Sequence, residues 1–384
     1  MYNYKQRMGV CMRTRYRVIA AFITVAFLLP GQEGPKQDVG ETVAKPRKKG
    51  ANDSETDLPK IPSKLNKNKA DLPEGTPSFK VETNVVNVDV AVLDNKGHFI
   101  PNIPRQDFRI LEDNVPQQVA SFNTGEAPMT VCLVIEFSNR YQQYWTETWY
   151  QTLSAAYGFI ETLKPEDYAA VVAYDMRSEI LADFTTDKRK INEAMQRLRI
   201  AGFSESNLYD ALVDTADRMS SIEGRKAIVL ISSGVDTFSK LTFDKTRKAL
   251  QNASVPIYAI GLMQALREWY DARGAMGPIQ RMDFLQADNQ MRTFAKETGG
   301  QSYFPRFYGE FPGIFAAVGD SLRHQYTLTY SPTNSARDGK FRKIKIELVN
   351  PATNEPLRVV DEKGKPIKYS IIAKSGYNAP REVE

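Results

Sequence analysis

The pattern of apolar and polar residues divides the chain after residue 78 into three blocks. In the first block, apolar residues recur in short strand-like runs over 81–92, 108–111 and 119–122. Turn signals at 94–97 and 112–114 separate these runs, as expected between β-strands. A block of this size is too small to form a stable hydrophobic core by itself. We therefore predict that it is part of a larger β-domain.

From Met129 onward, strand-like runs alternate with helix-like runs. Residues 131–135 are continuously apolar, which is typical of a strand buried on both faces of a parallel sheet. A short turn around Arg177 indicates that one strand is antiparallel. The expected strands are 131–135, 168–174, 179–184, 227–231, 256–260 and 301–304, and the expected helices are 145–163, 187–198, 208–219, 244–253, 284–298 and 314–323. This alternation predicts an α/β fold with a doubly wound sheet. Ligands of such sheets bind at the carboxyl ends of the strands, which here means the loops after Ile135 and Ile231.

The β pattern returns after His324, with expected strands at 326–330, 341–348, 358–360 and 369–372. Neither this block nor the first has enough strands to cover its own apolar face. An inserted domain leaves the two flanking segments close together. We therefore predict that residues 78–127 and 326–384 form one β-sandwich, into which an α/β domain of residues 128–325 is inserted.

The first 77 residues differ in composition from the rest of the chain. Three arginines, Arg13, Arg15 and Arg17, precede twelve mostly apolar residues at 18–29. This run is shorter than the ~20 residues that span a bilayer, and it predicts a secretory signal within residues 1–31. An uncleaved membrane anchor and a buried helix are the alternatives. Residues 32–77 are rich in Lys, Pro, Asp, Asn and Glu, and predict a disordered linker. We therefore expect a secreted, periplasmic or cell-envelope protein, whose membrane contact is limited to an N-terminal anchor.

Charge and cysteine content argue against a nucleic-acid-binding protein and against a disulfide-stabilised one. The net charge of +5 lies in residues 1–77, which contain 14 Lys and Arg against 8 Asp and Glu, while the remainder holds 37 and 38. Nucleic-acid binding needs basic residues gathered on a folded surface, so we expect none. Cys11 precedes the apolar run, and Cys132 lies within an apolar strand, where a free cysteine acts as a small hydrophobic residue. Cleavage of the signal leaves Cys132 alone, so no intrachain disulfide is expected.

Several short motifs occur in a specific order along the folded part. They are Asp107–Asp113, Pro128 at the entry to the first central strand, Asp183–Asp187, Leu208–Leu212, Lys226–Ile231 followed by Gly234, Tyr326–Tyr330, Arg337–Gly339 and Gly376-Tyr377. With these motifs, residues 129–325 resemble a von Willebrand factor A (VWA) domain. Residues 79–380 resemble the bacterial VWFA-related family of exported proteins first recognised in acidobacteria. The resemblance implies a Rossmann-like VWA sheet and a protein-binding role.

The resemblance also implies a divalent-ion site, a metal-ion-dependent adhesion site, built from an Asp-x-Ser-x-Ser loop, a later Thr and a later Asp. Mg²⁺ suits such a site because it binds oxygen ligands and retains waters. The corresponding residues in this chain are Glu136, Ser138, Arg140, Ser206 and Ser233. Glu136, Ser138 and Ser206 can still offer oxygens, and Asp236 is a candidate replacement carboxylate.

Arg140 opposes cation binding, because it brings a permanent charge to a position where the family has a neutral ligand. Three hypotheses stay open: a weak Mg²⁺ site, a vestigial face in which Glu136 and Arg140 pair with each other or with neighbours, and capture of an acidic partner by Arg140. We expect no required cofactor, and Mg²⁺ only as a doubtful ligand.

The other candidates favour binding over catalysis. His98 and His324 lie in different blocks, and a histidine at the end of a helix is typically a capping residue. No catalytic sequence signature is present. The candidate partner-binding residues are Arg140, Tyr141, Tyr144 and Asp236, since aromatic and arginine side chains anchor protein contacts. The long segment 263–283 is a candidate second contact element.

The sequence therefore predicts an exported protein-binding module with a degenerate metal site and an unidentified protein partner. A structural envelope component without a ligand is the first alternative. An enzyme with an unrecognised carboxylate site, formed by Glu136, Asp210 and Asp236, is the second.

Overall fold

The computed structural model describes residues 85–95, 97–138, 153–154, 156–198, 203–274, 277–360 and 364–381. The predicted signal at 1–31 and the predicted linker at 32–77 lie outside the described residues. No helix in the part that is described is long and apolar enough to cross a membrane.

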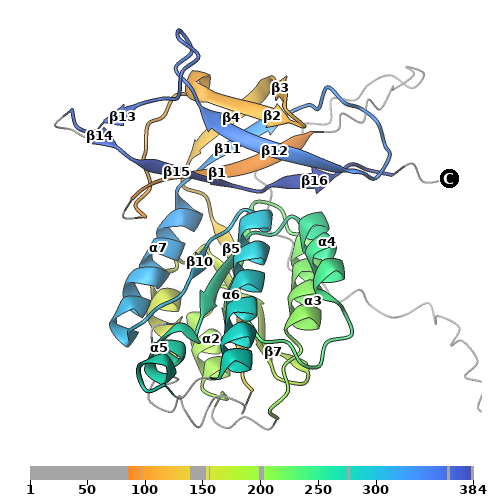
Figure 1. Cartoon of the computed structure of the whole chain (residues 1–384). Helices are drawn as coiled ribbons and strands as arrows, with labels where there is room; N and C mark the ends of the chain where they lie inside the picture. The colour runs from red at the N-terminus through yellow and green to blue at the C-terminus, as the bar shows by residue number, and fades with distance from the viewer. Residues whose placement is uncertain are drawn as a thin grey trace, which may run out of the picture. The chain divides into compact units, whose positions relative to one another are not determined.

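A six-stranded sheet forms the centre of the α/β domain (Figure 1). Its strands follow the order β10-β9-β8-β5-β6-β7. They are β5 (Met129–Glu136), β6 (Tyr168–Tyr174), β7 (Ser178–Thr185), β8 (Arg225–Ser232), β9 (Ile257–Gly261) and β10 (Ser302–Tyr303). All neighbours pair in parallel except β6 and β7. The sheet therefore has the predicted doubly wound form with an antiparallel edge strand.

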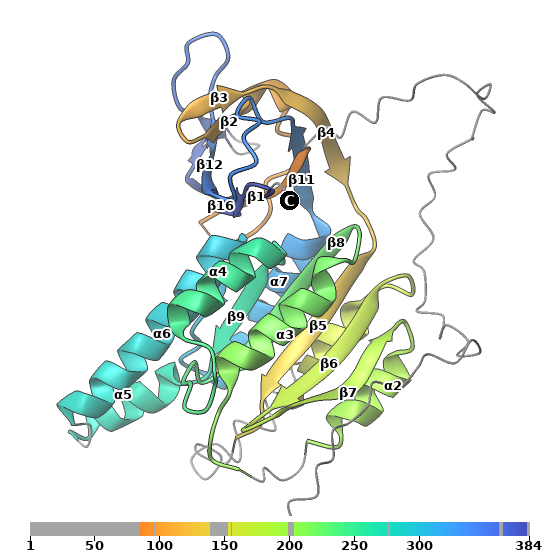
Figure 2. The same cartoon turned by 90° about the vertical axis from the view of Figure 1, so that its right-hand side faces the viewer.

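Helices cover both faces of this sheet (Figure 2). A helix over 156–162 is followed by α2 (Lys188–Met195), α3 (Leu208–Ser220), α4 (Phe243–Ala253), α5 (Gln264–Ala272), α6 (Pro278–Thr298) and α7 (Phe311–Arg323). Strand β5 shows why two helical layers are needed, because its side chains alternate between two cores. Val131 and Leu133 belong to the core shared with α2 and α7. Cys132 and Val134 belong to the core shared with α3, α4 and α6.

Cys132 is a free, buried cysteine, as predicted. Burial raises the pKa of its thiol to about 12. The thiol therefore stays protonated at neutral pH, and Cys132 acts as a core residue without reactivity.

The two ends of the folded part build two four-stranded sheets, which we call the sandwich. One sheet has the order β15-β1-β11-β4 and the other β16-β12-β2-β3, and a separate β13-β14 pair completes the block. The strands are β1 (Val86–Asp94), β2 (Phe108–Glu112), β3 (Val115–Gln117), β4 (Val119–Gly125), β11 (Gln325–Tyr330), β12 (Phe341–Leu348), β13 (Val359–Val360), β14 (Pro366–Ile367), β15 (Tyr369–Ala373) and β16 (Gly376–Asn378). Strand β1 pairs with both β11 and β15 from the C-terminal block. Both sheets contribute to one apolar core, which explains why neither block is sufficient alone.

The two connections between sandwich and α/β sheet lie at the same end of the sheet. Strand β4 leads directly into β5, and α7 leads directly into β11. The guanidinium of Arg225, at the start of β8, donates hydrogen bonds to the backbone oxygens of Gly125 and Arg323 and ties these connections together. The carboxyl ends of the parallel strands therefore lie at the edge opposite the sandwich (Figure 2).

The long segment 263–283, which lies between a predicted strand and a predicted helix, contains helical structure. It contains α5, and α6 begins already at Pro278. The guanidinium of Arg267 on α5 donates to the buried carboxylate of Asp288 on α6 at 2.7 Å. Arg281 pairs with Asp271 in the same way. These two ion pairs connect α5 to α6.

Candidate functional site

The carboxylate of Glu136, the last residue of β5, is buried at the strand-end edge of the sheet, with 6% of the residue exposed. Its Oε1 accepts a hydrogen bond from Ser138 Oγ at 2.8 Å. Its Oε2 accepts from Ser232 Oγ at 2.9 Å, and from both the backbone N and the Oγ of Ser233 at 2.7 Å. Four donors from the chain itself thus solvate this carboxylate. We call Glu136, Ser138, Tyr174, Ser232 and Ser233 the Glu136 cluster.

Sheet register brings the cluster together. Glu136 lies opposite Tyr174 in the β5–β6 pair, and β8 ends at Ser232 on the other side of β5. The hydroxyl of Tyr174 donates to Ser232 Oγ at 2.7 Å, so it supports a donor of the carboxylate. Burial, with the negative charge of Glu136 adding to it, holds the pKa of the Tyr174 hydroxyl well above its usual value. This hydroxyl is therefore a permanent donor.

Gly234 allows the loop after β8 to turn toward α6. Its φ of 77° is in the left-handed region, which favours glycine. A Cβ atom at this position would lie 2.7 Å from Met291 Cε and 2.9 Å from the backbone oxygen of Ala287 on α6. Its backbone N donates to Ser232 Oγ at 2.8 Å. The turn thus fixes both serines beside Glu136.

Ser206 is held by the loop that follows the cluster. Its backbone N donates to Thr237 Oγ1 at 2.9 Å, and its backbone oxygen accepts from the N atoms of Thr237 and Phe238 at 2.8 and 3.0 Å. The Oγ of Ser206 is buried and has no hydrogen-bond partner among the described residues. Of the predicted oxygens, this is the one that the chain leaves unsatisfied.

Asp236 directs its carboxylate toward α3. Its Oδ1 accepts hydrogen bonds from the backbone N of Tyr209, in the first turn of that helix, and from Ser239 Oγ. Asn207 precedes the helix without capping it through its side chain, so Asp236 supplies the acceptor that the helix start favours. Burial raises the pKa of Asp236. The contacts of this residue are those of a helix cap.

The hypothesis of a carboxylate-based enzyme site requires Glu136, Asp210 and Asp236 to share one centre. The two carboxylate oxygens of Asp210 instead accept from the backbone N atoms of Lys240 and Leu241 at 3.0 and 3.1 Å. Each of the three carboxylates is thus satisfied by its own local donors.

The two histidines make contacts with neighbouring acidic residues. His98 lies 3.3 Å from a carboxylate oxygen of Asp94 in an exposed turn. His324 forms the C-terminal cap of α7, where its Nδ1 lies 2.7 Å from Asp320 Oδ1 and its Nε2 lies 3.4 Å from Glu126. The position of His324 agrees with the capping role expected from the sequence.

Three of the predicted partner-binding residues, Arg140, Tyr141 and Tyr144, lie in 139–152, outside the described residues. The structure does describe two cluster residues that the sequence analysis did not include as site residues, Tyr174 and Ser232. Their position at the ends of strands adjacent to β5 was the available signal.

The oxygens gathered here are a poor match for a tightly bound divalent ion. Mg²⁺ and Ca²⁺ sites in proteins rely on carboxylate ligands, and this cluster supplies one carboxylate, which already accepts four hydrogen bonds. No group of three His, Cys, Asp or Glu side chains that could hold a metal occurs among the described residues. The unsatisfied Ser206 Oγ is the feature that favours a ligand.

The strand-end edge of the sheet lies within a segment that matches a known domain family. Residues 134–235, from β5 to the turn after β8, match the model of the von Willebrand factor type A domain. The six-stranded sheet has a VWA fold. The matched segment contains Glu136, Ser138, Ser206 and Ser233, so the positions compared with the family's metal site lie inside it.

Solved structures with low sequence identity also align with the chain. Proximal thread matrix protein 1 from the mussel byssus aligns at 12% identity and a TM-score of 0.42, over 55% of this chain and 51% of that protein. The chain thus spans about half the length of the mussel protein. The vWF domain of the type V pili tip protein Mfa5 from Porphyromonas gingivalis aligns at 13% identity and a TM-score of 0.39, over 51% and 97%. BatB from Bacteroides thetaiotaomicron aligns at 13% identity and a TM-score of 0.37, over 50% and 98%. The search of curated proteins found no match.

Proposed function

We propose that this chain is an exported protein-binding module that uses the strand-end face of its VWA sheet without requiring a divalent ion. The observation that carries the proposal is the hydrogen bonding of Glu136. In a metal-dependent site the ion balances the carboxylate charge, whereas here hydroxyl and backbone donors solvate it. Several hydrogen-bond donors compensate a buried carboxylate for the water contacts that it has lost. The cluster then serves as a fixed support for the loops around it.

Exposed aromatic side chains beside this support favour a protein partner. Phe238 is 52% exposed, and Phe203 is 48% exposed. The backbone of Phe238 is hydrogen-bonded to Ser206, and Phe203 precedes Ser206 by three residues. Large aromatic residues contribute much of the binding energy at protein interfaces. Their exposure at the edge opposite the sandwich supports a docking role for this face.

Three further parts of the proposal rest on the sequence. The basic residues and apolar run within 1–31 support export to the periplasm, cell envelope or exterior. The motif order over 79–380 supports membership in the acidobacterial-type VWFA-related family. Arg140, next to the Glu136 cluster in sequence, is proposed to contact an acidic residue of the partner.

Site-directed photocrosslinking in the producing cells tests the binding face. A benzoylphenylalanine placed at Phe238 should give a discrete crosslinked partner, whereas the same group at the exposed Val115 of β3 should not. Arg140→Ala should reduce the crosslink if charge capture contributes. Equal crosslinking at both positions, or none at Phe238, would contradict a specific strand-end interface and favour a purely structural role.

The metal part is tested separately on the purified full chain. Calorimetric titration with Mg²⁺ and Mn²⁺, together with elemental analysis, should show no stoichiometric ion. The Phe238 crosslink should persist when a chelator is added. Micromolar ion binding that is lost in Ser138→Ala would show that the cluster is a working metal site.

A further inference from the structure

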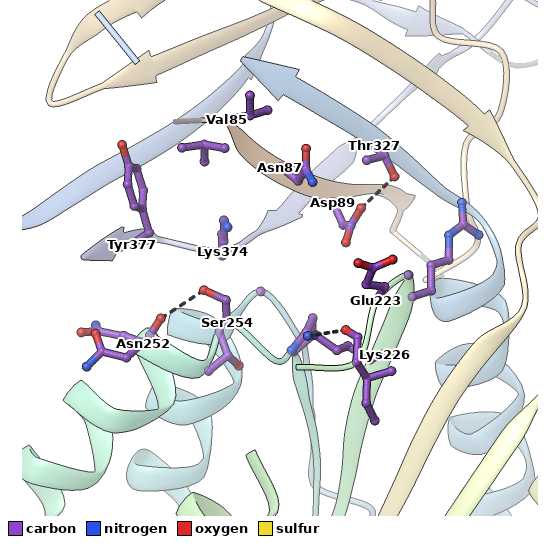
Figure 3. Close-up of a pocket in the computed structure, with 18 of the residues that line it drawn as sticks. Val85, Asn87, Asp89, Glu223, Lys226, Asn252, Ser254, Thr327, Lys374 and Tyr377 are labelled. Carbon is purple, nitrogen blue, oxygen red and sulfur yellow. Dashed lines mark hydrogen bonds between the residues drawn. The ribbon is translucent and has the colours of Figure 1, made fainter. Parts of the chain in front are cut away.

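A large polar cavity lies at the other end of the sheet, between the start of β8 and the sandwich strands. Its volume is about 1590 Å³, which exceeds the ~300–1,000 Å³ typical of small-molecule sites. Figure 3 shows Asn87, Asp89 and Thr327 on the sandwich side, with Lys226 and Ser254 on the side of the α/β domain. The cavity therefore has room for a ligand together with water.

Hydrogen-bonding and charged groups make up somewhat more than half of its lining. The uncharged polar residues include Asn87, Asn123, Thr124, Ser254, Thr327 and Tyr377. Five cationic residues line it, namely Arg225, Lys226, Lys248, Lys374 and Arg381, against three acidic ones, Asp89, Glu126 and Glu223. Because Glu126 pairs with Lys164 and His324 outside the cavity, the excess of positive charge inside is larger than this count indicates.

Backbone oxygens, rather than carboxylates, hold the cations at the start of β8. Lys226 Nζ donates to the backbone oxygens of Ser220 and Ile222 at 2.6 and 2.8 Å. An ammonium group has three N–H donors, so one remains for a ligand. The guanidinium of Arg225 likewise binds backbone oxygens of Gly125, Arg323 and Gln325. These contacts position the two side chains but leave their charges unneutralised.

Lys374 has no such contacts. Among the described residues, its Nζ has neither a hydrogen bond nor an ion pair, although its backbone is fixed. Ser375, next to it, donates from its N and Oγ to the backbone oxygen of Glu297 at 3.2 and 3.1 Å. A Cβ at Gly299 would lie 2.6 Å from the N atom of Lys374, so the chain packs tightly against the end of α6. An ammonium group with a fixed backbone and no hydrogen-bond or ion-pair partner among the described residues is suited to receive an anionic group.

The pKa values of the cations that line the cavity agree with an excess of positive charge. Burial lowers the pKa of Lys374, Lys226 and Arg225, and the charge of Asp89 opposes that effect at all three. The carboxylate of Asp89 also accepts a hydrogen bond from Thr327 Oγ1 at 2.7 Å. Asp89 thus acts on all three desolvated cations, and Glu126 adds to its effect at Arg225.

We propose that this cavity binds a small, hydrophilic organic anion, whose phosphate or carboxylate groups contact Lys374 and the free donor of Lys226. The charge excess selects an anion, and the polar lining selects a hydrophilic one. The site lies at the opposite end of the sheet from the Glu136 cluster, so the inference does not depend on the proposed protein-binding face.

Calorimetry on the full-chain protein tests the proposal with three probes: pyrophosphate, citrate and uncharged sucrose. Saturable binding of at least one anion is expected, with no binding of sucrose and with an affinity that falls as salt is added. A preference for pyrophosphate identifies a phosphate ligand, and a preference for citrate identifies a carboxylate ligand. Absence of saturable binding of both anions at millimolar concentration would overturn the proposal.

Matched variants locate the binding. Lys374→Met should weaken the anion about tenfold or more, because it removes a charge-assisted hydrogen bond. Asp89→Asn should strengthen it, since it removes the opposing carboxylate while keeping an acceptor for Thr327. Lys245→Met, on the exposed part of α4 outside the lining, should have no effect. Equal affinities of the wild type, Lys374→Met and Asp89→Asn would show that the anion binds elsewhere.

Discussion

Replacing Ser233 by aspartate tests whether the Glu136 carboxylate is a buried anion without a metal. Ser233 is 3% exposed, and its Oγ donates to Glu136 Oε2 at 2.7 Å. Aspartate is the residue that the VWA resemblance implies at this position. Ser233→Asp exchanges a donor for a second negative charge beside the first. In a domain that holds a metal ion at this site, the added carboxylate would coordinate the ion. In this chain, the added carboxylate should repel that of Glu136.

The magnitude follows from the geometry. With the two carboxylates about 4 Å apart and an effective dielectric constant of about 20, their repulsion is about 4 kcal/mol. One carboxyl group can relieve it by taking up a proton, but near pH 7 this costs a comparable amount. We therefore expect Ser233→Asp to lower the free energy of unfolding by about 3–4 kcal/mol relative to Ser233→Asn. This is a large share of the ~5–15 kcal/mol that stabilises an ordinary domain.

Urea denaturation of the wild type, Ser233→Asn and Ser233→Asp measures this difference. Ser233→Asn has nearly the shape of aspartate without its charge, so the comparison isolates the repulsion from the lost serine hydrogen bond. The repulsion raises a carboxyl pKa in the folded variant, so the folded state binds more protons than the unfolded state. Stability of Ser233→Asp should therefore recover as the pH falls from about 7 toward about 4.

The same denaturation experiment is repeated with divalent ions. With a second carboxylate near Ser138 and Ser206, millimolar Mg²⁺ should stabilise Ser233→Asp by mass action, and it should leave the wild type unchanged. If Ser233→Asp is as stable as Ser233→Asn in chelator, Glu136 is not an isolated buried charge. If Mg²⁺ stabilises the wild type, the ion-independent site is the wrong interpretation.

Three further changes test other parts of the structure. Asp167→Ala should cost about 3–5 kcal/mol in urea denaturation, because it removes the buried partner of Arg323 at 3.0 Å and the acceptor of the backbone N atoms of Met129 and Lys164. A loss below about 1 kcal/mol would contradict a structural role for this carboxylate. Tyr330→Phe should cost about 2–3 kcal/mol, since its hydroxyl donates to the buried carboxylate of Glu112 at 2.6 Å and a charged acceptor loses a donor; an unchanged denaturation midpoint would refute this. Burial raises the pKa of Asp236, so its charge reduces stability above that raised pKa and the effect disappears as the pH falls toward about 4. The stability of Asp236→Asn relative to the wild type should accordingly increase between about pH 4 and 7, and a difference independent of pH would contradict it.

The arrangement of the sheets could be predicted because it depends on patterns that repeat over many residues. Continuous apolar strands require cover on both faces, and each incomplete β-block requires the other. The α5 segment was predicted only as part of a long connection, although Leu266, Trp269 and Tyr270 recur at helical spacing. The contact of Arg267 with Asp288, 21 residues further along the chain, could not be predicted from a local pattern.

The proximity of the residues at the strand ends could be predicted, but the orientation of their side chains could not. The carboxyl ends of β5 and β8 lie at one edge, so Glu136 and Ser233 were expected near each other. The orientation of a carboxylate depends on which donors reach it, and this is decided by side-chain conformations. Asp236 illustrates the limit, because its sequence position is equally compatible with a role in the cluster and with the observed contact to Tyr209 of α3.

The departures from the VWA pattern at 136 and 233 are best understood as one change rather than two. Glutamate is one methylene longer than aspartate, and its carboxylate reaches the Oγ of Ser232 and both the N and the Oγ of Ser233. An aspartate at 233 would remove one of these donors and add a repelling charge. Serine at 233 removes the charge that an ion would have balanced and supplies a hydrogen bond in its place. Under the proposed ion-independent function, each substitution thus offsets the cost of the other.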